Sequence, residues 1–196
     1  MGFYVSDTWI AQHKLPVANQ TQTHTPFVST NDILVAEFCK LLKCDVALMA
    51  INFRGRVAGC GEDDIGNYED LITYTPADYA SPQLIRNSIS GGVYAGAARP
   101  PVALPTNWEH ASGATYGAIT NWATFAKPLL FDGAEQELHL PLLNFDAATP
   151  ARIFGAMVVF SPIAGRVGVL VAGKAELILA VKNSGMAGSA LGIKMI

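Results

Sequence analysis

The sequence predicts an α/β fold of the α+β kind, with a mixed sheet whose helices lie mainly on one face. Three observations favour this class: an amphipathic stretch with helical spacing, a short and almost wholly apolar run directly after it, and a series of further short apolar runs toward the C-terminus. A chain of 196 residues can bury one substantial core. We therefore expect one domain over residues 29–196, preceded by a connecting segment over residues 1–28.

The first predicted element is a helix that begins at residues 29–32 and ends near Lys43. Ser29 stands three residues before Asp32, which is the spacing of a capping box, where two side chains satisfy otherwise unpaired amides at the start of a helix. Five apolar residues then fall close to one helical face: Ile33, Leu34, Phe38, Leu41 and Leu42. This pattern indicates a helix packed on one side.

The next elements are predicted to alternate between strand and helix. Residues 46–53 are almost wholly apolar and suit a central buried strand. A glycine-containing loop follows, and residues 69–74 can form a second strand. A second helix is expected from Ser81–Pro82 onward, because proline is favoured at a first helical position.

The C-terminal part is predicted to be a run of strands, at least partly antiparallel. Its short apolar stretches are separated by turn sequences and cover residues 129–131, 138–143, 153–160 and 167–171. Residues 174–182 can form a helix over the sheet, and residues 187–196 are either a frayed tail or a last strand.

Composition and charge favour a small-molecule partner. Hydrophobic residues make up 51% of the chain, but the longest apolar candidate, residues 153–172, is interrupted by Ser161, Pro162, Gly165 and Arg166, so we expect no membrane span. The first 16 residues lack the continuous apolar core of a secretory signal, which predicts a cytoplasmic protein. A net charge of -3 without a basic cluster argues against nucleic-acid binding.

The cysteines and the acidic residues give no sign of a metal site. Cys39, Cys44 and Cys60 are an odd number without a CxxC pair, so reduced thiols are the expectation. Residues 62–64 are three adjacent carboxylates in a glycine-rich loop, where a solvated surface is the better interpretation. We predict no metal.

No standard catalytic motif is present. None of the four histidines, His13, His24, His110 and His139, begins an HxxxD sequence, and no GxSxG, GxxxxGK[ST] or HExxH motif occurs. More informative are Arg54 and Arg56, which leave the end of the predicted buried strand. Arginines there can hold a carboxylate or phosphate by bidentate hydrogen bonds, although exposed charges that merely end the strand are the alternative.

The order of several short motifs resembles the C-terminal half of acyl-CoA-dependent acyltransferases of the plant and fungal BAHD type, which have a chloramphenicol acetyltransferase-like fold. The motifs are Ser-Thr-Asn-Asp at 29–32, Asn-x-Arg-x-Arg at 52–56, Ile-Gly-Asn at 65–67, Thr-Asn-Trp at 120–122 and Phe-Asp-Gly at 131–133. They resemble, in order and approximate spacing, a helix opened by Ser-Thr, an RxR-type strand end, a Gly-Asn, a Thr-Ser-Trp and the Asp-Phe-Gly-Trp-Gly motif of that family.

The resemblance implies specific roles for residues of this chain. Acyl-CoA would be the co-substrate, with no bound cofactor, and Asn121 and Trp122 would lie near the CoA tunnel. Asp132 would form a structural ion pair with Arg54. In this family the other half supplies the HxxxD histidine as general base, so the chain alone would have no catalytic residue that we can identify. The resemblance therefore leaves open whether the chain is itself an enzyme.

Two other functions remain as alternatives. A non-catalytic binding or self-assembly module could keep the half-fold and use its exposed face to pair with another chain. An unrelated structural protein is the second alternative, supported by the apolar, glycine- and alanine-rich segment over residues 153–196. In each case we expect a partner, either a second acyltransferase half or another copy of this chain.

Overall fold

The computed structural model describes residues 1–18, 27–66, 68–90, 94, 96, 114–123, 132–133, 140–141 and 153–191. The described elements, in chain order, are β1 (Gly2–Val5), α1 (Asp7–Ala18), α2 (Thr30–Leu42), β2 (Val46–Asn52), β3 (Glu69–Tyr74), the 3-10 helix η1 (Asp78–Ala80), α3 (Pro82–Ile89), β4 (Tyr116–Asn121), β5 (Ile153–Phe160), β6 (Gly168–Gly173), α4 (Ala175–Asn183) and β7 (Ala187–Ala190).

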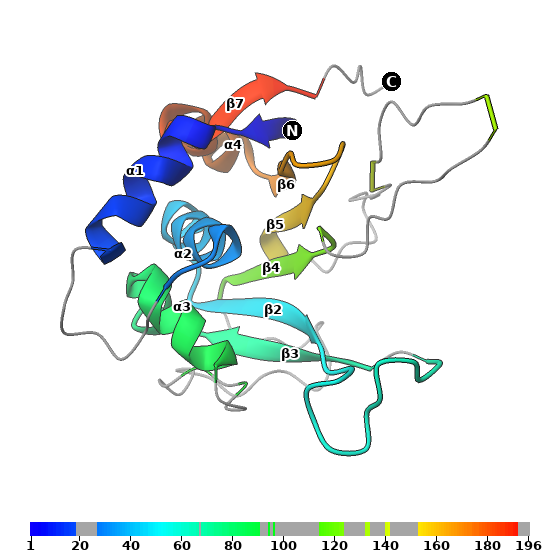
Figure 1. Cartoon of the computed structure of the whole chain (residues 1–196). Helices are drawn as coiled ribbons and strands as arrows, with labels where there is room; N and C mark the ends of the chain where they lie inside the picture. Colours follow the sequence, from blue (N-terminus) through cyan, green and yellow to red (C-terminus); the bar gives the residue numbers. More distant parts are fainter. Residues whose placement is uncertain are drawn as a thin grey trace.

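The described strands form one mixed sheet of seven strands in the order β3-β2-β4-β5-β6-β1-β7. Strands β2, β4 and β5 are parallel neighbours, whereas β3 at one end and β6, β1 and β7 at the other are antiparallel to the strands beside them. The described α-helices gather on one face of this sheet, with α2 in the middle (Figure 1). The predicted fold class is confirmed.

Helix α2 is the central element of the core. Its capping box forms as predicted, since the Ser29 side chain accepts from the amide of Asp32 and the Asp32 side chain accepts from the amide of Ser29. The helix ends at Lys43, which has a left-handed conformation with φ of 55°. More of α2 is buried than a helix packed on one side would bury, because α1, α3 and α4 all pack around it.

Three glycines in register let α2 and α4 approach the sheet closely. Gly117 of β4 is opposite Gly155 of β5, which is opposite Gly173 of β6. A Cβ atom at Gly155 would lie 2.6 Å from Leu177 of α4 and 2.9 Å from Leu42 of α2. The glycine row therefore forms a trough that receives these two leucine side chains.

The sheet includes a strand that the sequence did not predict. Strand β4 lies between β2 and β5, and it contains a glycine and few large apolar side chains, so it lacks the apolar run that marks a central strand. Its start is joined to β2 by Asp45, whose carboxylate accepts from the amide and the hydroxyl of Thr115, both at 2.8 Å. These hydrogen bonds lower the pKa of Asp45.

The first 18 residues, predicted as part of a connecting segment, contain a strand and a helix. Strand β1 pairs with both β6 and β7. Phe3 and Val5 alternate into the core from β1, and Trp9 of α1 is buried beside them. These apolar residues are few and lie among polar neighbours, which is why the segment resembles a connection in the sequence alone.

The other predicted elements divide into those confirmed and those outside the described residues. The predicted strands at 46–53, 69–74, 153–160 and 167–171 correspond to β2, β3, β5 and β6, and the predicted helices after Ser81 and over 174–182 correspond to α3 and α4. Residues 187–190 form a last strand. The strand predicted at 129–131 lies outside the described residues, as does most of that predicted at 138–143.

The core lies between the helices and the sheet and includes the thiols of Cys39 and Cys44. Burial raises the pKa of Cys39, while a hydrogen bond from Cys39 lowers the pKa of Cys44. Among the helices described here, none has the length and apolar character needed to cross a bilayer.

Candidate functional site

The site is built where two parallel strands end beside the start of a helix. Strands β2 and β4 run in the same direction, so Asn52 and Asn121, their last residues, lie at the same edge of the sheet. Helix α2 leads into β2 through a short turn, and its N-terminus lies near this edge. The side-chain amide of Asn121 donates to Asn31 Oδ1 at 2.9 Å and so joins β4 directly to the first turn of α2.

A buried charge pair fixes the first turn of α2 to α3. Asp32 is fully buried, and its Oδ2 atom accepts from Ser29 N at 2.6 Å and from Arg86 Nε at 2.8 Å. The distance from Arg86 Nη2 to the same oxygen is 2.6 Å. The other carboxylate oxygen, Oδ1, is buried and has no hydrogen-bond partner within the described structure.

Arg86 is held on a second side as well. Its guanidinium lies 4.9 Å from the ring centre of Phe27, an exposed side chain just before α2. One edge of the guanidinium is thus bound to Asp32 and one face covers Phe27. The side chain is 18% exposed, so part of the guanidinium, paired with Asp32, reaches the surface of the site in a fixed orientation.

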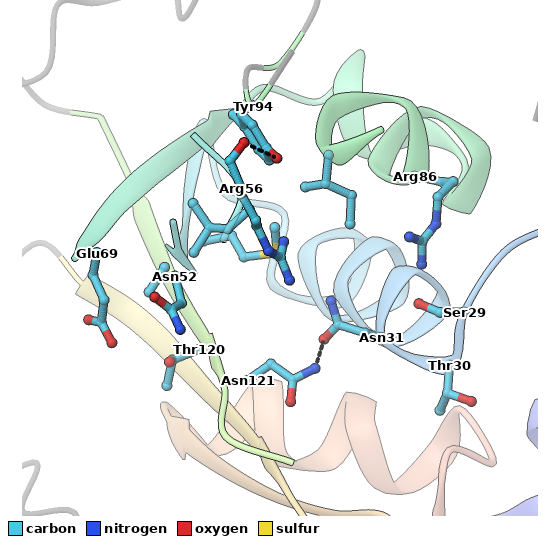
Figure 2. A pocket seen from close by; sticks show the side chains of 14 residues that line it. Ser29, Thr30, Asn31, Asn52, Arg56, Glu69, Arg86, Tyr94, Thr120 and Asn121 are labelled. Atoms are coloured by element: carbon cyan, nitrogen blue, oxygen red, sulfur yellow. Dashed lines mark hydrogen bonds between the residues drawn. The ribbon is translucent and has the colours of Figure 1, made fainter. Parts of the chain in front are cut away.

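A cavity of about 700 Å³ lies at this edge of the sheet (Figure 2). Its floor and walls come from the ends of β2, β3 and β4, the first turn of α2, α3 and the residues after β2. The described residues that line it are Ser29, Thr30, Asn31, Met49, Ala50, Ile51, Asn52, Arg56, Glu69, Arg86, Ile89, Tyr94, Thr120 and Asn121. This volume is within the range of small-molecule sites.

The charges of the cavity are separated between its walls. Arg86 and the start of α2 lie on one side, Glu69 lies on the other with Asn52 and Thr120, and the Arg56 guanidinium extends between them (Figure 2). Among the described residues, one ion pair is present, and it joins Arg86 to Asp32. In that part of the chain, neither Arg56 nor Glu69 has an oppositely charged side chain within 4 Å. The N-terminus of α2 adds partial positive charge on the arginine side.

This arrangement can bind an anion at the arginine side and a hydrogen-bonding or positively charged group at the Glu69 side. Arginine suits phosphate because its planar donors match the oxygens of that group. In the described part of the chain, no three His, Cys, Asp or Glu side chains come together to hold a metal ion.

The structure places the predicted tunnel residues as follows. Asn121 lines the cavity, and its Oδ1 accepts from the amide of Ala123 at 2.8 Å. Trp122 is the next residue and is not part of the lining. Its amide donates to the carbonyl of Val159 at 2.7 Å, which extends the pairing of β4 with β5 by one residue.

Arg54 does not point into the cavity but organises the loop after β2. Its Nε donates to the carbonyl of Asp64 at 2.9 Å, and its Nη2 donates to the carbonyl of Gly66. The guanidinium also lies 5.1 Å from the ring centre of Tyr68. Asp132 is exposed and is described only together with Gly133. The ion pair of Arg54 with Asp132 stays a prediction.

The one described histidine, His13, does not line this cavity. His13, on α1, is the one histidine among the described residues, and His24, His110 and His139 lie outside them. The Nδ1 atom of His13 is 2.8 Å from the carbonyl of Trp9. His13 lines a separate cavity of about 370 Å³ between α1, α2 and the start of α3.

Sequence reasoning found part of this site and missed the rest. It singled out Arg56 and Asn121, and its capping box located the start of α2. It missed Arg86 and Glu69, because one is an ordinary polar position of a short helix and the other begins an edge strand. The proximity of Asp32 to Arg86, 54 positions apart, has no local signal in the sequence.

Solved structures of acyltransferases share this fold. F. graminearum TRI101, crystallised with coenzyme A and T-2 mycotoxin, matches with a TM-score of 0.60 and 16% identity over 93% of this chain and 47% of its own. Vinorine synthase matches with a TM-score of 0.59 and 12% identity over 96% of this chain and 48% of its own. Both are BAHD acyltransferases. This chain therefore spans about half the length of each.

A shorter protein has the same fold at lower similarity. A probable dihydrolipoamide acetyltransferase from Listeria monocytogenes has a TM-score of 0.50 and 9% identity, over 100% of this chain and 87% of its own. No protein-family model matches the sequence, and no curated protein matches it significantly. At these identities the comparisons show the fold, and the predicted resemblance is confirmed at that level.

Proposed function

We propose that this chain is the coenzyme A-binding half of an acyl-CoA-dependent acyltransferase, corresponding to the C-terminal domain of the BAHD type. The observation that carries the proposal is the cavity at the ends of β2 and β4, which has two arginines and a helix N-terminus on its walls. Coenzyme A is bound in the crystals of F. graminearum TRI101, which has this fold.

The two arginines suit the phosphate groups of coenzyme A in different ways. Arg86 is held in place by Asp32, so little side-chain entropy is lost when it binds an anion. Arg56 has no opposite charge within 4 Å among the described residues and extends into the cavity (Figure 2). A phosphate between them would also lie near the partial positive charge of α2.

We assign Asn121 and Trp122 to the acyl-CoA site, as the resemblance implied, but with different parts in it. Asn121 would contact acyl-CoA directly, since it lines the cavity and is oriented by Asn31. Trp122 would shape the adjoining tunnel without lining the cavity itself. The Arg54 and Asp132 pair would stabilise the fold and would not take part in chemistry.

Among the described residues, the site has no base of the expected kind. The sequence contains no HxxxD motif, and no histidine is among the described residues that line the cavity. We therefore expect little or no acyl transfer from the chain alone. A second acyltransferase half, or another copy of this chain, would have to supply the group that takes the proton from the hydroxyl or amine acceptor.

The test is calorimetric titration with coenzyme A, together with a thiol-release assay on acetyl-CoA. We expect R56Q to weaken coenzyme A binding about 5- to 10-fold, because it removes one charge-assisted contact. R166Q is the matched control, since Arg166 is also exposed but lies against Tyr4 on another part of the molecule. The control should bind coenzyme A like the unmodified chain.

Each outcome bears on a separate part of the proposal. Binding without thiol release supports a coenzyme A-binding half that needs a partner. Absence of binding at about 1 mM ligand would reject coenzyme A as the ligand. Turnover by the isolated chain would show that the site is complete and that its base is not a histidine of an HxxxD motif.

A further inference from the structure

We propose that the adenine ring of coenzyme A stacks on Tyr94, so that the cavity at the ends of β2 and β4 holds the nucleotide end of the coenzyme. The inference rests on the proposed function and deepens it, because it names which part of the ligand this cavity binds. The thioester lies at the opposite end of the pantetheine arm, so acyl transfer would take place outside the cavity.

Tyr94 is the one aromatic side chain among the described residues that line the cavity. It is half-buried, and it packs against the main core, as do Phe53 and Ile89. The rings of Tyr94 and Phe53 meet edge to face, with 5.1 Å between their centres and 86° between their planes. These contacts orient the Tyr94 ring before any ligand binds.

The backbone at Tyr94 has a conformation that is unusual for an aromatic residue. Its φ of 47° lies in the left-handed region, where a Cβ atom crowds the backbone and glycine or asparagine is more common. Residues strained in this way persist only where the surrounding structure holds them, and they cluster at functional sites. The strain at Tyr94 therefore supports a binding role for this ring.

An apolar wall accompanies the Tyr94 ring, and an arginine lies beside it. Met49 and Ile51 of β2 and Ile89 of α3 line the same cavity. The hydroxyl of Tyr94 donates to the carbonyl of Arg56 at 3.4 Å, so the two residues are neighbours in the cavity wall (Figure 2). The cavity thus offers a flat apolar surface next to a positive charge.

The nucleotide end of coenzyme A matches this combination. It is an adenosine with a phosphate at the 3′ position and a diphosphate at the 5′ position, and only the ribose separates the flat base from these phosphates. Stacking on Tyr94 would bury one face of the base. Arg56 and Arg86 would donate to the phosphate oxygens. The pantetheine arm has no ring, so an aromatic platform would contribute little to its binding.

The experiment is an NMR titration of the full chain with adenosine 3′,5′-bisphosphate and, separately, with 4′-phosphopantetheine, which represent the two ends of the coenzyme. We expect Y94L to weaken binding of the bisphosphate about 5- to 10-fold, because it removes the stacking ring and keeps an apolar side chain. Binding of coenzyme A should weaken by the same factor, and binding of 4′-phosphopantetheine should not change. Y94F keeps the ring and should bind the bisphosphate like the unmodified chain.

F27L is the matched control for the loss of an aromatic ring beside an arginine. The ring centre of Phe27 lies 4.9 Å from the Arg86 guanidinium, but Phe27 is not among the described residues that line the cavity. F27L should therefore leave bisphosphate binding unchanged. Nuclear Overhauser effects between the adenine protons and the Tyr94 ring of the unmodified chain give a test that does not depend on the folding of any variant.

Three results would overturn the proposal: an equal effect of Y94L and F27L, absence of adenine contacts with Tyr94 in the saturated complex, or no saturable bisphosphate binding at about 10 mM. Coenzyme A binding that does not depend on Tyr94 would leave the proposed function standing and reject the stacking. Bisphosphate binding through Tyr94, without binding of coenzyme A, would leave the adenine site standing and reject the proposed function.

Discussion

Asp45 shows how one side chain joins two strands that lie far apart in the sequence. It precedes β2, and its carboxylate accepts two hydrogen bonds from Thr115, 70 positions away at the start of β4. The carboxylate can accept these bonds fully only when it is ionised. The contribution of Asp45 to stability should therefore depend on pH.

We predict that D45N lowers the free energy of unfolding at pH 7 and that this effect disappears in acid. The hydrogen bonds from the amide and the hydroxyl of Thr115 hold the pKa of Asp45 in the folded chain below its ordinary value. Its stabilisation is therefore complete above about pH 5 and is lost as pH falls through the lowered folded value. Because the side chain is exposed, the effect should stay below about 1 kcal/mol.

Urea unfolding at neutral and at acidic pH measures this effect. D70N serves as the control, since the Asp70 carboxylate accepts a local hydrogen bond from the amide of Leu71 and joins no distant segment among the described residues. A D45N effect that is the same at both pH values would show that the Asp45 carboxylate does not stabilise β4.

Individual site residues could be predicted only where the sequence carries a local pattern. Ser29 and Asp32 were located because a capping box has a fixed spacing of three residues. Arg86 could not be located in the same way, because it reaches the site only when α3 packs against α2 in the folded chain. The cavity itself arises from several segments that meet only after folding.

The glycine trough explains both a packing feature and a missed strand. In β4 and β5, Gly117 and Gly155 occupy positions where a larger residue would collide with Leu42. The same glycines weaken the apolar alternation by which a strand is recognised in a sequence. Strands β2 and β5, with long apolar runs, were predicted from sequence, whereas β4 between them was not.

We predict that G155A destabilises the chain by about 1 to 3 kcal/mol through overpacking against α4. The added methyl group would lie 2.6 Å from Leu177 Cδ2. L177A alone should also be destabilising, because it leaves a cavity beneath α4. In the double variant G155A/L177A the new methyl group occupies vacated space, so the loss should be less than the sum of the two single losses.

Urea unfolding of the four forms gives the coupling free energy of this double-mutant cycle. We expect a favourable coupling of about 1 kcal/mol. Additive effects would mean that the two side chains do not compete for the same space, and would contradict the trough.

The whole sheet depends on the N-terminal segment. Strand β1 lies between β6 and β7, so its removal would separate β7 from the sheet. The segment also places Phe3 and Trp9 in the core. This global role could not be predicted from sequence, because the strand has four residues and all its partners lie near the other end of the chain.

We predict that a chain lacking residues 1–28 loses its cooperative unfolding transition. Far-UV circular dichroism and urea unfolding of the shortened chain, compared with the full chain, provide the measurement. A shortened chain with the same stability would support the original expectation that residues 1–28 only connect.

The pairing of β1 with both β6 and β7 has a consequence for connectivity. Gly2 lies opposite Leu170, and its carbonyl accepts from the amide of Leu191, so the two ends of the described chain are neighbours. Because these ends are adjacent, a chain in which they are joined, and which begins and ends at another loop, could make the same contacts. A linker between the ends, with a new opening in the exposed loop between β2 and β3, would keep the helices, the sheet and the core while reordering the sequence.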